Sequence, residues 1–511
     1  METNTGLFSR LFLIVLVIKA FDVFKNLLIA YFLGVSDSAD VYNSIIIIPD
    51  SLIVLFGLDT IRGVVNSEYA HSYGLERKDE LWESFRRLFS ILLVTGIAVT
   101  IAVLILNPLI IGLILPGFDG AKKNAAIGIA YIVFPILFFK ILSGYFHSVL
   151  NSVKSFYLPV IAPAMISVLI VISVMLPSPE GGLIYNLSYA NLAGNILLLL
   201  IFGYSLKNLG AIFRWAGLKP DELTLKVIKA SGSIMMLVVF NQIYLFSRNY
   251  FASYFGEGAI SALHYSGTIP SIVISVVFAT FFTAIISKLS TLFSEGKDSD
   301  AGQLYRKTIL ALLFFVVPVV AVFLSSGEEL LKLLYLRGEF DLKGIELTMK
   351  PYYWDVMSLI TFVLYILPTA YFLACKDYKR LSIAGSSVYI AGTVLNYFLT
   401  AELGFYAVSV THLIITGIYG FILLSMSLPR GEERTQFFKT ALMIIAGGAV
   451  SFFLVNITGP LIRNVSIAAS WQRDLFVVIV NTAVTLAVFL SAMQILRINF
   501  AFEFVKGLAK K

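Results

Sequence analysis

The sequence is short of charge, and this shortage decides the class of protein. Only 14% of the 511 residues are charged and 58% are hydrophobic, and the mean hydropathy is +0.88. An average soluble domain carries about 25% charged and about 45–50% apolar residues. This composition therefore excludes a soluble enzyme, a disordered chain and a disulfide scaffold. The apolar runs have the length of membrane-spanning helices, unlike the roughly 10-residue alternating segments of a membrane barrel.

Motifs for covalent, metal and nucleotide chemistry are also missing. Cys375 is the single cysteine, so an internal disulfide is impossible and redox chemistry is not expected. The chain has no phosphate-binding loop ending in Gly-Lys-Ser/Thr, no His-Glu-x-x-His helix and no Gly-x-Ser-x-Gly elbow. We therefore expect a transporter without enzyme activity, metal site or resident cofactor. It would run on a monovalent cation gradient, the membrane potential or removal of its substrate.

Hydrophobic segments of helix length recur along the whole chain. A window of about 19 residues marks fourteen of them, which predicts an all-α polytopic membrane protein with 14 transmembrane helices. They lie near residues 8–33, 41–66, 88–114, 124–151, 157–176, 183–206, 230–254, 260–287, 308–325, 351–375, 381–399, 404–428, 440–457 and 474–496.

Lysine and arginine indicate which loops face the cytoplasm. The loops on the side of both termini hold 25 of the 38 lysines and arginines, and the opposite loops hold 8. Cytoplasmic loops of membrane proteins carry this excess, so we predict a multi-pass protein with both termini in the cytoplasm. Because these loops also account for much of the net charge of +7, a nucleic-acid partner is not expected.

Four pairs of short segments indicate an internal repeat of about 222 residues. They are Lys25–Phe32 with Arg248–Phe255, Ser38–Tyr42 with Ser261–Tyr265, Leu115–Asp119 with Leu336–Asp341, and Lys154–Phe156 with Lys376–Tyr378. Each repeat holds six spans, an even number, so both halves run the same way through the bilayer, as in transporters built from two rocking bundles. We predict an N-lobe at residues 1–215, a C-lobe at 216–430, and two added spans with a cytoplasmic tail at 431–511.

Charged residues inside the predicted spans mark a candidate substrate site. Lys19, Asp22 and Lys25 are spaced three apart on the first span and form one polar stripe. Arg248 occupies the position equivalent to Lys25 in the second repeat. Retained charges in a membrane usually face a wet cavity, and converging lysine and arginine suit phosphate or pyrophosphate. The alternative is internal pairing, in which Asp22 neutralises Lys19 or Lys25.

Three further charges complete the predicted site. Asp40 opens the second span and is expected to act in substrate binding or gating. Lys140 on the fourth span and Asp355 on the tenth, together with Asp22, are candidates for coupling or gating.

The sequence resembles the MurJ (MviN-like) lipid II flippases of the multidrug/oligosaccharidyl-lipid/polysaccharide exporter superfamily. The most specific stretch is Leu334–Asp341, which contains Arg-Gly-Glu-Phe. Gly34–Asp40 after the first span and Gly256–Tyr265 after the seventh also resemble the family. The resemblance covers essentially the whole chain.

The resemblance implies a flippase for a polyprenyl-diphosphate-linked saccharide, with lipid II as the first expectation. It implies movement from the inner to the outer leaflet of the bacterial cytoplasmic membrane by alternating access of two lobes around a cationic cavity. Spans thirteen and fourteen would form a groove for the polyprenyl tail. The expected partners are the lipid-linked oligosaccharide and membrane lipids, and the protein is expected to be a monomer.

Individual positions match the family only in part. Lys19 and Lys25 stand where the family has two first-helix arginines, and Asp40 matches the aspartate that opens its second helix. Three other arginine positions are occupied by Ile53, Val54 and Thr268.

Three alternatives remain open. The uncharged positions favour a flippase for another lipid-linked glycan, such as an O-antigen, capsule or exopolysaccharide unit. An ion-coupled small-molecule exporter would carry twelve spans and an acidic, aromatic cavity. A membrane-embedded glycosyltransferase would need clustered carboxylates and a sizeable extracytoplasmic domain.

Overall fold

The computed structural model describes residues 4–55, 58–179, 181–222, 224–225, 235–277, 282–463 and 470–498. Within these ranges the regular elements are helices, apart from an isolated β-bridge between Arg337 and Phe340. Most of the predicted cytoplasmic tail and the first residues of the predicted seventh span lie outside the described residues.

Contacts divide the chain into two compact units, Met1–Ser261 and Ala262–Lys511, here called unit 1 and unit 2. The helices of unit 1 are α1 (Asn4–Leu33), α2 (Asp37–Ile46), α3 (Ile48–Leu55), α4 (Leu58–Gly74), α5 (Lys78–Ile105), α6 (Asn107–Ile114), α7 (Gly120–Val133), α8 (Ile136–Ser152), α9 (Tyr157–Ile161), α10 (Ala164–Val174), α11 (Leu183–Asn208) and α13 (Met235–Ala252). Helix α14 (Ala259–Ser266) contains the boundary. Unit 2 continues with α15 (Thr268–Val277), α16 (Thr283–Ser294), α17 (Asp298–Ser325), α18 (Gly327–Tyr335), α19 (Leu342–Ala374), α20 (Tyr378–Leu403), α21 (Ala407–Ser427), α22 (Glu432–Arg463) and α23 (Ser470–Ile495).

Each of the fourteen predicted segments falls on one helix or on consecutive helices. The segment at 41–66, for example, falls on α2, α3 and α4. Prolines lie at several of the breaks, with Pro49 second in α3, Pro135 just before α8 and Pro163 just before α10. Proline lacks the N–H that would continue the preceding helix, so a break is tolerated there.

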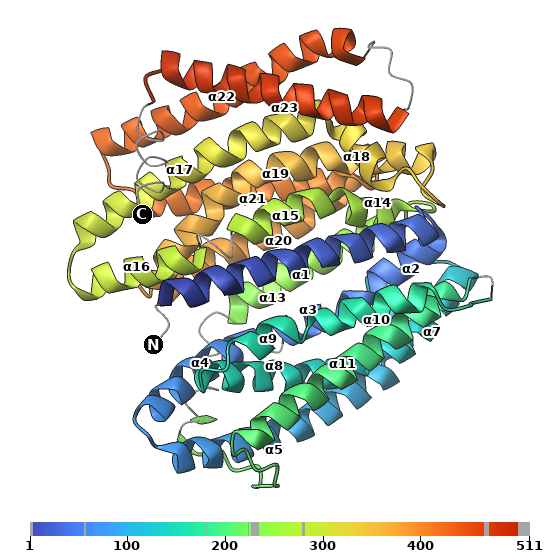
Figure 1. The fold of residues 1–511 in the computed structure, drawn as a ribbon, viewed down its shortest axis with the longest axis vertical. Coiled ribbons are helices and arrows are strands. Elements are labelled where there is room, and N and C mark those ends of the chain that lie inside the picture. The colour runs from blue at the N-terminus through green and yellow to red at the C-terminus, as the bar shows by residue number, and fades with distance from the viewer. Residues whose placement is uncertain are drawn as a thin grey trace. The chain divides into compact units, whose positions relative to one another are not determined.

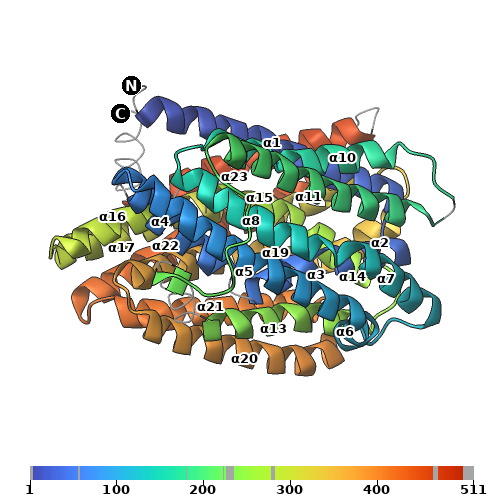
Figure 2. The same ribbon diagram turned by 90° about the horizontal axis from the view of Figure 1, so that it is seen from below.

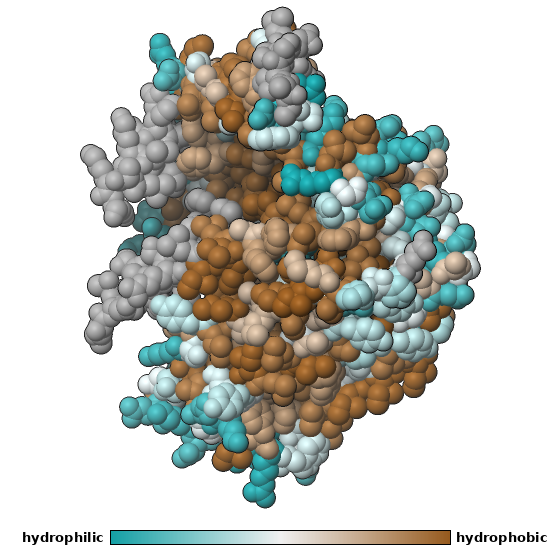
Figure 3. All heavy atoms as spheres, turned by 45° about the vertical axis from the view of Figure 1, so that its right-hand side comes forward, coloured by the Kyte–Doolittle hydropathy of each residue, from teal (hydrophilic) through white to brown (hydrophobic). Residues whose placement is uncertain are grey.

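Ten of the described helical segments are long and apolar enough to cross a membrane. They are Asp37–Leu55, Lys78–Ile105, Gly120–Ser152, Tyr157–Val174, Leu183–Asn208, Asp298–Ser325, Leu342–Ala374, Ala407–Ser427, Glu432–Gly459 and Ser470–Ile495. Large apolar side chains are exposed on these helices, such as Ile105 on α5 and Ile479 on α23, and apolar residues cover much of the surface in Figure 3. The chain is therefore an all-helical, multi-pass membrane protein.

Within unit 1, the core that positions the polar residues is built by α4, α8, α10 and α11. Helix α8 packs against α4 and α11, and α10 lies between α11 and α1 (Figure 1 and Figure 2). Helix α13, which the predicted lobe boundary at 215/216 assigns to the C-lobe, packs on α3 and α6 of unit 1. In unit 2, α19 packs on α21, and α22 packs on α17 and α23.

Two turns recur at nearly the spacing of the sequence repeat. Lys154 after α8 and Lys376 after α19 have left-handed φ angles of +64° and +59°. The amide of Lys154 donates to the carbonyl of Asn151, and the amide of Lys376 donates in the same way to that of Leu373. The turn after α4, with Glu76 at φ +62°, likewise matches the turn after α16, with a glycine at φ +70°. The paired turns thus share backbone conformations that most residues avoid.

The left-handed turn after α19 generates a stability prediction. Lys376→Gly should raise the midpoint of thermal unfolding of the detergent-purified protein, followed by tryptophan fluorescence. The left-handed helical region costs residues with a Cβ roughly 1–2 kcal/mol, and glycine avoids that clash. The control is Lys379→Gly in the first turn of α20, where glycine costs about 1 kcal/mol and the midpoint should fall. A fall of equal size in both variants would contradict the prediction.

Candidate functional site

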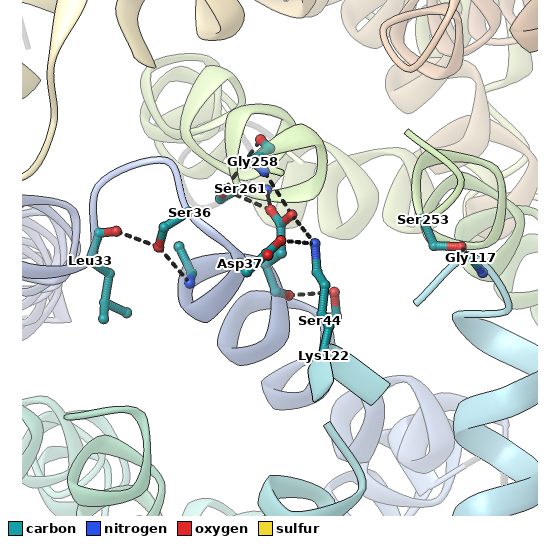
Figure 4. Close-up of polar contacts among 11 residues, drawn as sticks. Leu33, Ser36, Asp37, Ser44, Gly117, Lys122, Ser253, Gly258 and Ser261 are labelled. Carbon is teal, nitrogen blue, oxygen red and sulfur yellow. Dashed lines mark hydrogen bonds and ion pairs between the residues drawn. The ribbon is translucent and has the colours of Figure 1, made fainter. Parts of the chain in front are cut away.

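One buried carboxylate with several polar partners lies where α2 begins. Asp40 is 1% exposed. Its Oδ1 accepts hydrogen bonds from the backbone N–H and the hydroxyl of Ser261, both at 2.7 Å. Its Oδ2 accepts from the backbone N–H of Gly258 at 2.9 Å and pairs with Nζ of Lys122 at 2.8 Å (Figure 4). Lys122 also pairs with Asp37 at 2.5 Å.

Asp40 therefore caps the start of α14 from a different helix. The N–H groups at a helix start lack intrahelical partners and carry partial positive charge, which a carboxylate stabilises. Gly258 has a φ of +83°, and a Cβ at this position would collide with Val35, so the close approach requires glycine. In this conformation both Asp40 oxygens are occupied by protein donors. We call this set, Asp40, Lys122, Gly258 and Ser261, the α2–α14 clamp.

The polar stripe predicted on α1 is present as an ionic cluster. Nζ of Lys19 lies 3.7 Å and Nζ of Lys25 lies 4.0 Å from the Asp22 carboxylate. The hydroxyl of Ser167 on α10 donates to Asp22 at 2.7 Å. Asp22 thus pairs with both lysines, as the pairing alternative expects, but both N–O distances are near the upper limit for an ion pair. The side chain of Lys19 is 55% exposed and that of Asp22 is 30% exposed, so solvent also reaches the cluster.

A polar pocket of about 440 Å³ lies inside unit 1, and this volume is typical of small-ligand sites. It is lined by Asp50, Arg62, Gly63, Asn66, Lys140, Ser143, Gly144, His147, Ser148, Asn151, Pro163, Ile166, Asn195, Leu198 and Phe202. Asp50 and Lys140 form an ion pair at 2.6 Å across the pocket wall. On α8, Nδ2 of Asn151 lies 3.3 Å from Nδ1 of His147. Permanent cations outnumber carboxylates among the lining residues.

Arg62 reaches the pocket from α4 and rests on α8. Its Nη2 donates to the backbone carbonyl of Lys140 at 3.2 Å. A Cβ added at Gly144 would collide with the guanidinium group, so the side-chain-free surface of this glycine allows the two helices to place Arg62 there. Small residues permit such close packing in membrane helix bundles.

The structure groups some of the predicted site residues and separates others. Lys19, Asp22 and Lys25 form one cluster, and Lys140 lines the pocket. Arg248 lies half-buried on α13 and is not among the residues that line the pocket. Asp355 lies on α19 in unit 2, where it is 6% exposed and accepts a hydrogen bond from Ser266 at 2.5 Å.

Sequence reasoning missed Lys122 and did not place Arg62 in the site. The signal for Lys122 was the Lys-Lys pair at 122–123, on the same predicted side of the membrane as Asp37 and Asp40. Among the described residues, no three His, Cys, Asp or Glu side chains are grouped closely enough to hold a metal ion.

Proteins with similar sequences and assigned names match more than half of the chain. The protein from Rhizobium meliloti (strain 1021) named "Probable lipid II flippase MurJ" is 28% identical over 337 residues, which is 63% of this chain and 62% of that protein. The chain thus matches under two thirds of that relative. A protein of the same name from Buchnera aphidicola subsp. Schizaphis graminum is 24% identical over 372 residues, 71% of each chain.

Solved structures show the same fold. A lipid II flippase MurJ in an inward closed conformation is 20% identical, with a TM-score of 0.79 over 96% of this chain and 99% of that one. An inward-facing MATE family multidrug resistance transporter of the MOP superfamily has a TM-score of 0.67 at 14% identity, over 84% and 98% of the two chains. The family model described as "Lipid II flippase MurJ" matches residues 29–487. With most of its 511 residues matched, the chain belongs to the MurJ family.

Proposed function

We propose that this protein is a flippase for a polyprenyl-diphosphate-linked saccharide, with lipid II as the first candidate substrate. It would move the lipid from the inner to the outer leaflet of the bacterial cytoplasmic membrane by alternating access. The observation that carries the proposal is the placement of cationic side chains in helices α1, α4 and α8 of a MurJ-fold bundle. The relatives named lipid II flippases support the choice of substrate.

The physical task of such a protein is to carry a diphosphate through an apolar layer. An isolated ion in hydrocarbon costs tens of kcal/mol by Born estimates. In the proposed mechanism Lys19, Lys25 and Arg248 shield the diphosphate. The long distances from Asp22 to both lysines support this role, because a weak ion pair is readily exchanged for a phosphate.

The proposed architecture has fourteen spans, arranged as two parallel six-helix lobes and two further helices, with both termini in the cytoplasm. The recurring turns after α8 and α19 support the repeat. Helices α22 and α23 pack on each other and expose large apolar side chains such as Ile457 and Ile479. They suit the proposed role of holding a polyprenyl tail. The proposed active form is a monomer with membrane lipids around it.

Alternating access requires the α2–α14 clamp to break and re-form. Asp40 therefore acts as a gating residue in this mechanism. Asp22, Lys140 and Asp355 are the proposed coupling residues, and a monovalent cation or the membrane potential is the proposed driving force. One charge crossing the membrane supplies about 2.3 kcal/mol per 100 mV.

A second candidate function is transport of another lipid-linked glycan, and burial favours it. Ile53 is 3% exposed and Thr268 is 7% exposed. Two of the three positions where the family has arginines are therefore packed in the interior, and Val54 at the third is half-buried. The uncharged residues at all three leave fewer cations for the headgroup of lipid II.

The role of the α1 lysines predicts a loss of transport when their charge is removed. Combined Lys19→Ala and Lys25→Ala should lower translocation by about tenfold or more, because a hydrogen bond to a charged group contributes about 1.5–3 kcal/mol. The measurement is rescue of a bacterium depleted of its own lipid II flippase, at matched membrane abundance. Lys379→Ala, on the exposed start of α20, is the control and should rescue fully. Undiminished rescue by the double variant would end the role assigned to these lysines.

The gating role of Asp40 predicts a loss of stability when its charge is removed. Asp40→Asn leaves Lys122, whose side chain is 11% exposed, with Asp37 outside the clamp as its remaining carboxylate partner. Breaking a buried pair costs about 3–5 kcal/mol, and Asp37 should offset part of this. We expect a lower unfolding midpoint for purified Asp40→Asn than for Asp37→Asn, since the Asp37 side chain is 55% exposed. Equal midpoints for the two variants would argue against a clamp centred on Asp40.

A further inference from the structure

The chain that follows α11 forms a non-helical segment, residues 209–221, which lies against the first half of α5 (Figure 1). The backbone N–H of Ala216 donates to the hydroxyl of Ser90 at 3.0 Å. The guanidinium group of Arg87 donates to the backbone carbonyl of Lys219 at 3.4 Å. The segment is therefore held on unit 1 by specific hydrogen bonds.

An aromatic side chain fixes the middle of the 209–221 segment. The ring centre of Phe213 lies 5.6 Å from that of Phe85 and 5.5 Å from that of Phe89, both on α5. It lies 5.4 Å from the ring centre of Phe146 on α8. All three pairs have the edge-to-face geometry that aromatic rings prefer. The residues next to Phe213 are thus displayed on an ordered surface.

Large apolar side chains are exposed along this segment. Trp215 is 56% exposed, and Ile212 and Leu218 are also exposed. A group of exposed apolar side chains is unfavourable in water and marks a contact surface. The exposed Leu200 and Tyr204 lie shortly before the segment on α11, a helix long and apolar enough to cross a membrane. The lipid-facing surface of the bundle therefore continues into the segment.

The backbone of the segment excludes the hydrocarbon core as its surroundings. Across the part of the chain that the structure describes, the N–H groups of Ile212, Phe213 and Trp215 donate to no protein acceptor. In hydrocarbon every backbone polar group must find a partner in the protein. The headgroup layer supplies water and phosphate oxygens as acceptors, and tryptophan is enriched there. The segment therefore fits the boundary between lipid and water.

The charge on this surface has one sign. Residues 207–219 contain no carboxylate and three cations, Lys207, Arg214 and Lys219. All three cations are exposed, and none forms an ion pair with a described residue. The next acidic residue is Asp221, whose Oδ1 accepts a hydrogen bond from the hydroxyl of Ser84 at 3.4 Å. Cations grouped at the cytoplasmic end of a membrane helix attract anionic lipids.

We propose that Lys207, Arg214, Trp215 and Lys219 form a lipid surface that binds the headgroups of anionic phospholipids. The three cations meet lipid phosphates, and Trp215 lies at the level of the headgroups. The proposed topology places this loop in the cytoplasm, so the lipids belong to the inner leaflet. The surface gives unit 1 a fixed contact with the membrane, whichever substrate the protein carries.

Quenching of Trp215 fluorescence by brominated lipids tests the lipid surface. The full chain carries Trp82→Phe, Trp354→Phe and Trp471→Phe, which leaves Trp215 as its single tryptophan. It is reconstituted in phosphatidylcholine vesicles that contain the same fraction of brominated phosphatidylglycerol or brominated phosphatidylcholine. We expect phosphatidylglycerol to reach Trp215 with about fivefold higher affinity, because cations near a membrane surface attract anionic lipid.

Removal of the three cations should abolish this preference. In the single-tryptophan chain, the combined variant Lys207→Gln, Arg214→Gln and Lys219→Gln should bind the two lipids about equally. Quenching by brominated phosphatidylcholine should not change, since Trp215 stays at the interface. Size-exclusion elution in detergent identifies a variant that does not fold.

A matched control removes three cations elsewhere on the predicted cytoplasmic side. Lys154→Gln, Lys376→Gln and Lys379→Gln lie at exposed positions in or beside the turns after α8 and α19, and the combined variant should keep the preference. A salt titration needs no charge variant. High salt should lower the preference of the single-tryptophan chain, because salt screens exposed charges.

Four results would overturn the lipid surface. Absence of quenching by either brominated lipid would place Trp215 in water and indicate a soluble partner. Equal quenching by both lipids before any cation is removed would mean that anionic lipid is not selected. An equal loss of preference in the two charge variants would mean that these three cations have no special part in it. If the variant of the three cations does not fold, a preference that persists at high salt would contradict the proposal.

Discussion

A charge inside an apolar layer must be matched by another charge, by hydrogen bonds or by water, and the polar structure of unit 1 follows from this constraint. Lys140 pairs with Asp50, Lys122 with Asp37 and Asp40, and Lys25 with Asp22. These pairs come from different helices or successive turns of one helix. Each cation that the helices carry into the bundle therefore also constrains how those helices pack.

The pairs differ in exposure, and this difference separates their roles. Asp40 is 1% exposed and its carboxylate is bound by Lys122, Gly258 and Ser261, so opening the clamp costs more free energy than opening an exposed pair. Asp50 is 61% exposed although it pairs with Lys140 at 2.6 Å. An exposed ion pair contributes little free energy, so the Lys140–Asp50 pair opens more readily than the clamp does.

Glycines decide where charged side chains can be placed. Gly144 leaves room on α8 for the guanidinium of Arg62, and Gly258 lets the start of α14 approach Val35 and Asp40. Neither glycine carries any chemistry of its own. Each one removes a side chain at the point where another element must come close, which is how a bundle of mostly bulky apolar residues makes space for polar contacts.

Local patterns in the chain were enough to predict the membrane class and the helical segments, because the length of a hydrophobic run is set by neighbouring residues. The stripe of Lys19, Asp22 and Lys25 was predictable for the same reason, since helical spacing alone brings the three together. The partners of Asp40 lie 82 to 221 residues away, and Arg62 meets the Lys140 carbonyl across 78 residues. No periodicity relates such positions. They become neighbours only when separate helices pack, so the folded bundle alone determines which charges are clamped and which line a pocket.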